Sequence, residues 1–294
     1  MELRVLGPDC LETLYPAYLE AFSDYVIPVR PSFEAFASML ERRGANWERS
    51  IGAFDGERLV GLQITALGAH GSANVPTAYD VFTGIVPSHR GRGLAGRMFE
   101  AAVEALRPGE ARQFLLECIQ TNEPALRAYA KQGFQRVRAF ECLELDVEAA
   151  RTADADPGAA AGGRRLEVCE RELVALDDLA SVRTWTPSWQ NGDASLRRAD
   201  TAPLVLSAEH DGSLVGYVAC FRESGDVAQL FVRGATDFAP VARTLLSACA
   251  ARTSPGVERL RLVNVPTDAT RDLETYARVG ARSFTRQYEL IRPL

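Results

Sequence analysis

Apolar residues recur along the first half of the chain in helical stripes and in short alternating runs. The clearest stripe repeats every three to four positions and predicts a helix through Leu94, Ala95, Met98, Phe99, Ala102, Val103 and Leu106. A second stripe, formed by Phe33, Phe36, Met39 and Leu40, predicts a helix that ends near Gly44.

Runs of apolar and β-branched residues between these stripes predict strands. They cover residues 78–86, 114–119 and 134–145, the last as one strand or a pair of strands. A short helix is expected from about 123 to 132, ended by Gly133, and Asp55-Gly56 between apolar runs predicts a β-hairpin. Helices interleaved along a sheet are typical of the α/β class, here with a mixed sheet.

The pattern of the first half returns, weakly, in the second. The hairpin segment 53–61 resembles 208–216, and the segment 129–133 resembles 276–280. Residues 148–165 are rich in Ala, Gly and Pro and predict a linker. We therefore expect two tandem domains, 1–147 and 166–294, each a central mixed sheet flanked by helices.

Composition excludes several classes of function. The 294 residues are 47% hydrophobic, with a net charge of -6 and without a basic stripe, so nucleic acid is not an expected partner. Without an apolar run of about 18 residues or a signal-peptide pattern, no membrane association is expected and the protein should be cytoplasmic. The six cysteines lack a Cys-x-x-Cys pair, so no metal site is expected either.

The loop between the strand at 78–86 and the main helix carries the most specific signal. It reads His89-Arg90-Gly91-Arg92-Gly93-Leu94-Ala95-Gly96. A strand that turns through glycines into a helix directs backbone N–H groups and the positive end of the helix dipole at one point. Two arginines add positive charge. The loop therefore predicts a phosphate site, although glycine loops also serve as plain tight turns.

Two other phosphate-binding motifs have to be compared with this loop. Residues 91–96 match the Gly-x-Gly-x-x-Gly of dinucleotide-binding proteins, and Glu117 lies about 20 residues on, where a ribose-binding acid belongs. However, four residues separate the strand from the first glycine, and the chain does not continue into a doubly wound sheet. A Walker loop is excluded because no Lys-Ser/Thr follows the glycines.

The motifs downstream decide between these ligands. Arg90, Gly93 and Ala95, followed by Asn122, Tyr129 and Gly133-Phe134, resemble the GNAT superfamily of N-acetyltransferases. The resemblance covers about residues 1–147 and extends to the second half only in outline. It implies an N-acetyltransferase that uses acetyl-CoA and no metal.

The same resemblance implies where acetyl-CoA binds. The backbone of Ile85 and Val86 would pair with the pantetheine arm, and the pyrophosphate would be wrapped by Arg90, Gly91, Arg92, Gly93, Leu94, Ala95 and Gly96. Asn122 would contact the pantetheine where neighbouring strands splay apart. It is equally suited to cap the following helix, and both roles are compatible.

Acetyl transfer to an amine needs a base, a polarised carbonyl and a proton for the departing thiolate. The resemblance makes Tyr129 the general acid, unless it only packs against the sheet, and a backbone N–H around Val86 the oxyanion donor. Asp80 or Glu117 could be the base, directly or through water, unless each is merely salt-bridged. By alternation Asp80 shares a strand face with Phe82, Gly84 and Val86.

The acceptor pocket is expected from the segment that begins at Phe22. Asp24 and Tyr25 could receive an amine of a small molecule or a peptide, with Phe33 and Phe36 nearby. The helical spacing of the two phenylalanines also fits core packing. The edges of two sheets are compatible with a homodimer.

The second half has lost the phosphate chemistry when the repeat is aligned on Tyr276 and Gly280. Arg90 is then replaced by Asp237, Gly93 by Pro240 and Asn122 by Ala269. An acid repels phosphate, and proline has no N–H to donate. We expect a degenerate domain and one cofactor per chain.

Two further functions stay open beside the N-acetyltransferase. One is a non-catalytic acyl-CoA-binding or sensing protein, in which the loop binds and Tyr129 is structural. The other is an NAD-dependent oxidoreductase, suggested by the dinucleotide match.

Overall fold

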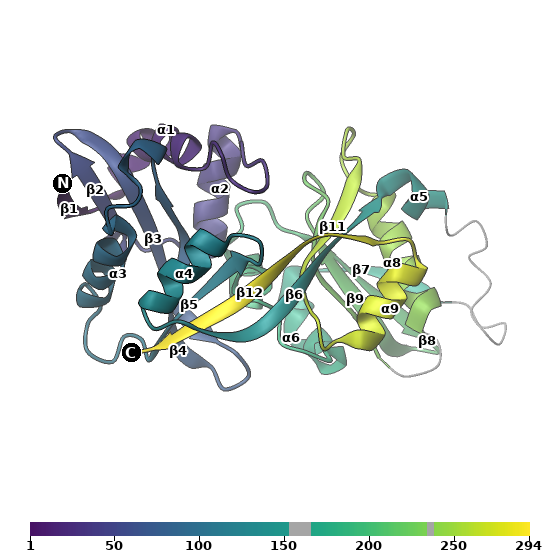
Figure 1. The fold of residues 1–294 in the computed structure, drawn as a ribbon. Helices are drawn as coiled ribbons and strands as arrows, with labels where there is room; N and C mark the ends of the chain where they lie inside the picture. Colours follow the sequence, from purple (N-terminus) through teal and green to yellow (C-terminus); the bar gives the residue numbers. More distant parts are fainter. Residues whose placement is uncertain (153–165, 234–237) are drawn as a thin grey trace. The chain divides into compact units, whose positions relative to one another are not determined.

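The computed structural model describes residues 1–152, 166–233 and 238–294 and divides into two compact units. The N-terminal unit consists of Met1–Arg138 together with Tyr288–Leu294, and the C-terminal unit of Ala139–Gln287. Each unit has its own buried core. Figure 1 shows the helices and strands of both units.

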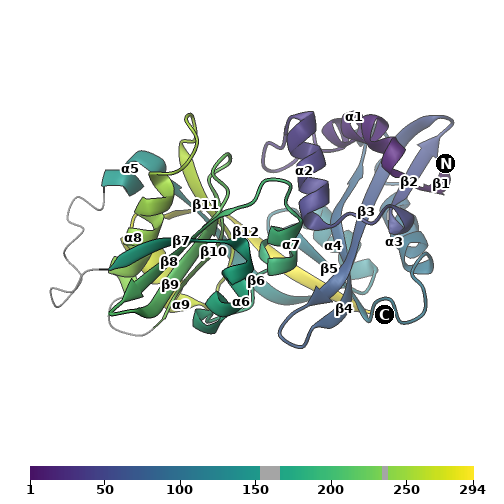
Figure 2. The ribbon, with the colours of Figure 1, turned by 180° about the vertical axis from the view of Figure 1, so that it is seen from behind.

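The N-terminal unit is a mixed sheet between two pairs of helices (Figure 2). Its strands, in spatial order, are β1 (Glu2–Val5), β2 (Ile51–Asp55), β3 (Arg58–His70), β4 (Val75–Ile85), β5 (Gln113–Ile119) and the end of β12 (Arg282–Pro293). Its helices are α1 (Leu11–Ala21), α2 (Phe33–Arg43), α3 (Leu94–Glu104) and α4 (Glu123–Lys131). Neighbours from β1 to β4 are antiparallel, whereas β4 and β5 are parallel. The predicted mixed α/β fold, its helices and its hairpin are confirmed.

The helix pairs cover opposite faces of this sheet. On one face, Met98 and Phe99 of α3 and Leu126 of α4 pack with Phe114 and other residues of β5. On the other face, rings from α1 and α2 pack against β4: Tyr18, Phe22 and Phe36 around Phe82. The face on which a β4 or β5 side chain lies therefore decides which helices it can meet.

The C-terminal unit repeats this order of elements. Its strands are the end of β6 (Gln135–Asp146), β11 (Arg259–Pro266), β10 (Asp226–Val232), β9 (Ser213–Cys220), β8 (Leu204–His210) and β7 (Glu167–Arg171). Its helices are α5 (Val147–Thr152), α6 (Leu176–Leu179), α7 (Asp193–Arg198), α8 (Phe238–Ala250) and α9 (Thr270–Arg278). β10 and β11 are parallel, like β4 and β5 in the first unit, whereas β10 with β9 and β11 with β6 are antiparallel.

The units differ from the expected domains because their last strands are exchanged. β6 passes from the first unit into the second after Arg138, where it pairs with β11, and β12 returns to the first unit at Tyr288. Glu289 on β12, 2% exposed, accepts a hydrogen bond of 2.7 Å from Arg138 and lies 3.3 Å from Nε2 of His70. This buried contact fixes the C-terminal strand in the N-terminal unit, which a division at residue 147 could not anticipate.

The expected linker lies mostly outside the described residues. Residues 148–152 belong to helix α5, whose Val147 and Ala150 are buried in the core of the C-terminal unit, and residues 153–165 are not described.

Candidate active site

The ladder between the parallel strands β4 and β5 stops before either strand ends. Its last pair is Tyr79 with Leu115, although β4 continues to Ile85 and β5 to Ile119. Beyond this pair the two strands are no longer paired with each other. Part of the backbone of β4 is bonded to side chains there, because Arg43 Nη1 donates to the carbonyl of Val81 at 3.3 Å and Arg90 Nε to that of Ile85 at 3.0 Å. A ligand that lies between the two strands would use the remaining backbone groups.

Asp80 is the first residue of β4 beyond the ladder. It is 5% exposed, and its Oδ2 accepts hydrogen bonds from the hydroxyls of Thr83 at 2.8 Å and Tyr129 at 3.4 Å. Burial raises the pKa of Asp80 to about 7, an effect that the two hydrogen bonds only partly oppose. A carboxylate with this pKa can accept and release a proton near neutral pH.

A β-bulge at Val81 places Asp80 on a different face from the one that alternation predicted. In the pairing of β3 with β4, Thr65 of β3 lies across from Asp80 and Ile64 lies across from Phe82. Val81 of β4 therefore has no partner on β3 and is the extra residue of the bulge. Phe82 consequently lies on the α1/α2 face, whereas Asp80 lies on the α3/α4 face with Tyr129. Gly84 also faces α1, because a Cβ added to it would lie 2.9 Å from the ring of Phe22. The expected shared face of Asp80, Phe82 and Gly84 is therefore wrong.

Tyr129 projects from α4 toward this carboxylate. Its ring packs edge-on against Phe134 at 5.6 Å, so the packing role considered from the sequence is also present. Burial, followed by the charge of Asp80, raises the pKa of Tyr129 well above its ordinary value, and the phenol stays protonated at neutral pH. The structure thus brings together two of the three predicted catalytic residues.

Three polar groups of this cluster were missed from the sequence. Gln63 and Thr65 of β3 lie directly across from Thr83 and Asp80 and are fully buried. In the described part of the chain, Asp80 Oδ1, Thr65 Oγ1 and both amide atoms of Gln63 have no hydrogen-bond partner. Buried polar atoms of this kind normally bind water or a ligand. The sequence contained a signal for them, because Gln63 and Thr65 are polar residues within the otherwise apolar part of strand β3.

Glu117 does not join the cluster. On β5, Leu116 and Cys118 belong to the core under α3 and α4, so by alternation Glu117 faces α1 and α2. There its Oε2 accepts a hydrogen bond of 3.2 Å from the hydroxyl of Tyr79. The structure places the two proposed bases on opposite faces of the sheet, and only Asp80 lies beside Tyr129.

The glycine loop has the geometry expected of a phosphate site. Gly91 and Gly93 have φ of 76° and 71°, the left-handed region that favours glycine, and a side chain at either position would point into open space. Gly93 is the N-cap of α3 and gives the first N–H groups of the helix no side-chain acceptor. Leu94 is 1% exposed, so it offers only its backbone, and Gly96 lies close to the side chain of Gln132.

The two arginines of the loop have different partners. Arg92 makes one hydrogen bond, from Nη2 to the carbonyl of Ser88 at 3.2 Å. Arg90 instead forms a two-pronged ion pair with Asp24, at 2.6 and 2.7 Å. Asp24, predicted to receive the acceptor amine, is therefore already paired with a cation, which lowers its pKa. An amine would have to displace a guanidinium to bind there.

The backbone of Ile85 and Val86 is partly used within the fold. The N–H of Val86 donates to the carbonyl of Val60 at 3.0 Å, because the pairing with β3 extends this far. The carbonyl of Ile85 accepts from Nε of Arg90 at 3.0 Å. Val86 itself is therefore not an available oxyanion donor, which corrects that expectation.

A groove of about 620 Å³ runs along the outer side of α3 from this loop. It is lined by Leu3, Gly93, Gly96, Arg97, Glu100, Ala101, Glu104, Lys131 and Gln132. Its charged side chains are mixed, because Arg97 and Lys131 are basic whereas Glu100 and Glu104 are acidic. The lining of the groove by itself therefore does not select an anion.

Asn122 and Tyr25 are the two remaining residues predicted for the site, and Asn122 lies between β5 and α4. Asn122 caps α4, its side chain accepting from the N–H of Ala125 at 3.3 Å, so the predicted cap is confirmed and its contact with a cofactor stays a prediction. Burial raises the pKa of Tyr25 to about 12, an effect that the nearby side chain of Asn122 partly opposes. Burial likewise raises the pKa of the neighbouring Cys118 thiol to about 12, so this cysteine stays protonated.

The corresponding place in the C-terminal unit is filled by the chain itself. The β10–β11 ladder also stops early, at Val227 with Leu262. Beyond it, Asn191 Nδ2 donates to the carbonyl of Val263 at 2.7 Å, while Gln229 Nε2 donates to the carbonyl of Asn191 at 2.7 Å. Asn191, 3% exposed, thus bridges the two diverging strands.

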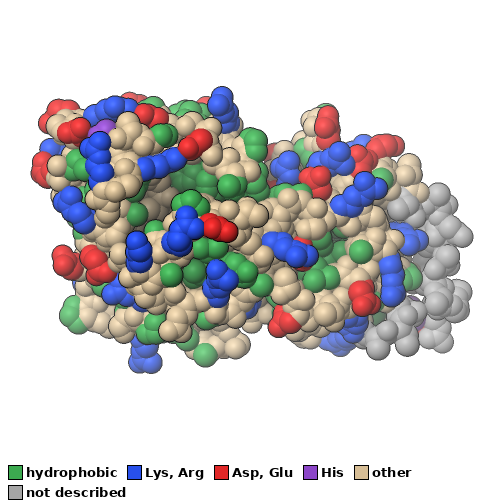
Figure 3. All heavy atoms as spheres, in the orientation of Figure 1, with side chains coloured by type: hydrophobic (Ala, Val, Ile, Leu, Met, Phe, Trp, Pro, Cys, Tyr) green, Lys and Arg blue, Asp and Glu red, His purple; other side chains and the backbone are tan. Residues whose placement is uncertain are grey.

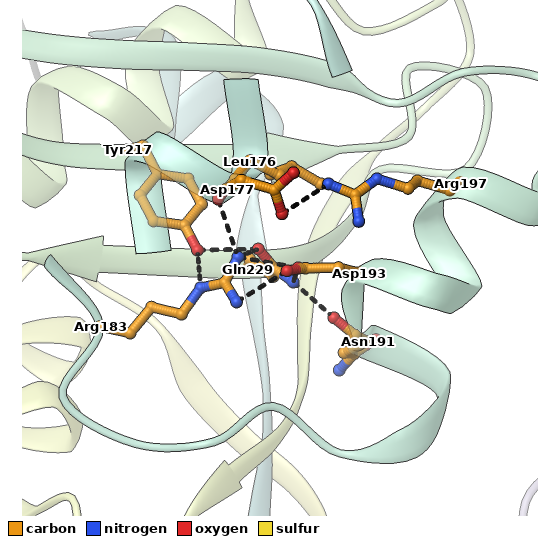
Figure 4. Close-up of polar contacts among 8 residues, drawn as sticks. All are labelled: Leu176, Asp177, Arg183, Asn191, Asp193, Arg197, Tyr217 and Gln229. Carbon is orange, nitrogen blue, oxygen red and sulfur yellow. Dashed lines mark hydrogen bonds and ion pairs between the residues drawn. The ribbon is translucent and has the colours of Figure 1, made fainter. Parts of the chain in front are cut away.

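Ion pairs and hydrogen bonds hold this bridging segment in place (Figure 4). Arg183 forms a two-pronged ion pair with Asp193 at 2.8 and 2.9 Å and donates to the hydroxyl of Tyr217 at 2.6 Å. Gln229 accepts from that hydroxyl at 2.8 Å and donates to Asp193 at 2.9 Å. Tyr217 and Gln229 are buried, Arg183 and Asp193 are partly buried, and the polar groups of the cluster bond to one another, which favours a structural role.

Other positions of the repeat also differ in chemistry. Tyr276, aligned with Tyr129, is fully buried and donates to the backbone carbonyl of Leu230 at 2.9 Å. Ala269, aligned with Asn122, is the N-cap of α9 and provides no side-chain cap. Of the loop aligned with Arg90 to Gly93, Asp237 lies outside the described residues, and Pro240 lies in the first turn of α8.

The described residues contain neither a metal-binding cluster nor a membrane-spanning helix. Within residues 1–152, 166–233 and 238–294, no group of three or more His, Cys, Asp and Glu side chains is arranged to hold a metal ion. None of the helices in these ranges has the length and apolar character needed to cross a membrane. Basic and acidic side chains are interspersed on the face drawn in Figure 3.

Comparison with known proteins identifies relatives of both sequence and fold. Residues 10–134 match the family described as Acetyltransferase (GNAT) family. N-alpha-acetyltransferase 30 of Schizosaccharomyces pombe is 29% identical over 91 residues, which are 31% of this chain and 60% of that protein. The match thus spans less than two thirds of this relative's length.

Solved structures resemble the whole chain. A GCN5-related N-acetyltransferase from Sphaerobacter thermophilus superimposes with a TM-score of 0.69 and 14% identity, covering 99% of this chain and 95% of that one. A tandem GNAT protein from the clavulanic acid biosynthesis pathway has a TM-score of 0.69 and 18% identity, covering 99% and 98%. At these identities the likeness is one of fold.

Proposed function

We propose that this chain, whose residues 10–134 match the Acetyltransferase (GNAT) family, transfers an acetyl group from acetyl-CoA to a primary amine of a small molecule or a peptide. The observation that carries the proposal is the pair of Asp80 and Tyr129, which lies where the β4–β5 ladder ends. The name of the yeast relative points to an α-amine of a peptide as one acceptor class.

The glycine loop supports acetyl-CoA as the donor. Gly91 and Gly93 leave open space beside backbone N–H groups at the start of α3, which suits a pyrophosphate. Arg92 adds a cation at the loop. When bound, acetyl-CoA supplies the thioester carbonyl and the thiolate leaving group.

Asp80 and Tyr129 then transfer the protons. In the proposed reaction the amine nitrogen bonds to the carbonyl carbon and the carbon–sulfur bond breaks. Asp80 accepts the proton that the amine loses, and Tyr129 donates a proton to the thiolate. Because a charged Asp80 raises the pKa of Tyr129, protonation of Asp80 makes Tyr129 a stronger acid. The two transfers therefore assist each other.

We propose that the C-terminal unit binds no acyl-CoA of its own. Asn191 bridges β10 and β11 where their ladder ends, through its bonds with Val263 and Gln229. The hydroxyl of Tyr276 is already bonded to a backbone carbonyl, whereas the hydroxyl of Tyr129 is bonded to a carboxylate. Only the N-terminal unit combines a glycine loop with an acid–base pair in the described part of the chain.

Calorimetric titration tests both proposals. Acetyl-CoA should bind the full chain at one site per chain, and coenzyme A release should follow when an amine panel that includes peptides is added. Two equivalent sites would contradict a degenerate second unit. Binding without turnover on any amine would support a sensing protein instead. Stabilisation against heat by NAD but not by acetyl-CoA would support an oxidoreductase.

A further inference from the structure

Arg90 uses its guanidinium to hold the segment that follows α1. Nη2 donates to the carbonyl of Ala21, the last residue of α1, at 2.9 Å, and Nε donates to the carbonyl of Ile85 at 3.0 Å. Two more hydrogen bonds, of 2.6 and 2.7 Å, reach the carboxylate of Asp24. One side chain of the phosphate loop thus joins the end of β4, the end of α1 and the following loop.

The pair stays charged at neutral pH. The hydrogen bond with Asp24 raises the pKa of Arg90, and the same bond lowers the pKa of Asp24. Both side chains are partly exposed, at 41% and 56%, which by itself makes an ion pair weak. The guanidinium, however, also donates to the backbone carbonyls of Ala21 and Ile85, which hold it in one orientation independently of Asp24. The pair is therefore preorganised on the Arg90 side.

Asp24 precedes a residue that reaches the reaction site. The ring of Tyr25 packs on Phe22 at 5.2 Å, and Tyr25 lies close enough to Asn122, the cap of α4, for that side chain to lower the pKa of its hydroxyl. Tyr25 is also close enough to Tyr129 to contribute to the raised pKa of that phenol. The segment from Phe22 to Tyr25 therefore connects the phosphate loop with the end of β5.

We propose that Arg90 and Asp24 form a latch that positions the acceptor-side segment 22–25 and couples it to occupancy of the phosphate loop. In this proposal Arg90 is a positioning residue, and the phosphate is held by the N–H groups of residues 91–96 and by Arg92. Acetyl-CoA bound at residues 91–96 stabilises the loop, and with it Arg90, in this arrangement, and through Asp24 it holds Tyr25 where the amine enters. The inference rests on the proposed acetyl transfer and assigns to Asp24 a role other than binding the amine.

Kinetics of Asp24→Asn separate this role from phosphate binding. The variant should raise KM for the best amine of the panel about fivefold or more, the size expected for an exposed ion pair, with kcat and the Kd for acetyl-CoA little changed. Asp24→Glu should recover most of the loss. Glu20→Gln is the matched control, because it removes an ion pair of similar exposure between α1 and Arg58 that does not touch the phosphate loop. An unchanged KM in Asp24→Asn would overturn the latch.

Hydrogen–deuterium exchange provides a readout that does not depend on turnover. Acetyl-CoA should slow exchange at the backbone of residues 22–25 in the unsubstituted chain and in Glu20→Gln, but not in Asp24→Asn. Binding of acetyl-CoA in calorimetry without slower exchange at 22–25 would overturn the latch and leave the proposed function standing. Absence of acetyl-CoA binding would overturn both.

Discussion

Tyr129 on α4 donates its hydroxyl proton to Oδ2 of Asp80 on β4 across 3.4 Å, although 49 positions separate the two residues in the chain. They meet because α4 packs on the sheet face to which the bulge at Val81 confines Asp80. The distance is long for a hydrogen bond between oxygens, and contacts of this kind commonly shorten when substrate binds. The pair gives the proposed reaction its base and its acid.

Tyr129→Phe should lower kcat about 100-fold or more and leave the Kd for acetyl-CoA unchanged, because it removes a proton donor but keeps the ring. The measurement is steady-state coenzyme A release together with calorimetry. Tyr276→Phe is the matched control in the repeat. It removes a buried hydrogen bond and should cost about 1 kcal/mol of stability without affecting kcat. An unaffected rate in Tyr129→Phe would remove Tyr129 from the mechanism.

The rate should rise as the pH increases through about 7, because only the charged form of Asp80 can accept a proton and its pKa is raised to about 7. Asp80→Asn should lower kcat/KM about 100-fold and abolish this rise. Profiles of kcat/KM against pH, measured for both proteins with the same amine, check this. If the rise persists unchanged in Asp80→Asn, another group is the base.

The same carboxyl group should make the protein less stable as the pH rises. A folded-state pKa of about 7 exceeds the unfolded value near 3.9, so between these values the folded state binds the extra proton and loses stability with increasing pH. Asp80→Asn has no such group, and its Tm should exceed that of the unsubstituted chain at pH 8 but not at pH 5. Equal Tm differences at the two pH values would contradict the raised pKa.

Gly93→Ala should weaken acetyl-CoA binding, because its φ of 71° costs a non-glycine residue about 1–2 kcal/mol and relaxation would turn the N–H groups away from the phosphate. Gly56→Ala is the control. Gly56 has φ of 61° in the β2–β3 turn, also with open space around it, so it should show a similar loss of stability. Calorimetry should find the Kd raised only in Gly93→Ala; equal affinities would exclude the loop as the phosphate site.

Glu289→Gln should destabilise the N-terminal unit by about 3 kcal/mol, because it leaves the Arg138 guanidinium without its buried anion. Its hydrogen bonds with His70 and Arg138 lower the pKa of Glu289 against the effect of burial. The stabilisation is therefore present above the unfolded pKa and is lost as the pH falls through the lower folded value. Denaturant unfolding at pH 7 and at pH 3 checks this. Glu274→Gln, which removes an exposed pair on α9, should change stability by no more than about 0.5 kcal/mol.

Much of the fold could be predicted from the sequence because its signals are local. Periodicity located α3 and α4, turn chemistry located the hairpin at Asp55-Gly56, and the glycines of the loop matched left-handed backbone. The internal repeat also matched: Phe134 and Ala281 donate equivalent hydrogen bonds to Tyr129 and Tyr276. These features depend on residues within a few positions of one another.

Features that depend on register between distant segments could not be predicted. Alternation placed Asp80 beside Phe82, but one bulged residue reversed the face of everything after it. The N–H of Val86 was expected to be free, whereas the length of the β3–β4 pairing decides that Val60 accepts it.

By itself the sequence determined which residue types this protein offers for binding phosphate and for transferring protons. It also determined the order of the helices and strands that carry them, because propensity and periodicity act within single elements. Only the tertiary structure decided which of those residues meet: Asp80 with Tyr129, Glu117 on the opposite face, and Asp24 with Arg90. It also decided that the last strand returns to the first unit. Such pairings are set by packing and hydrogen-bond register between segments far apart in the chain, which no local pattern encodes.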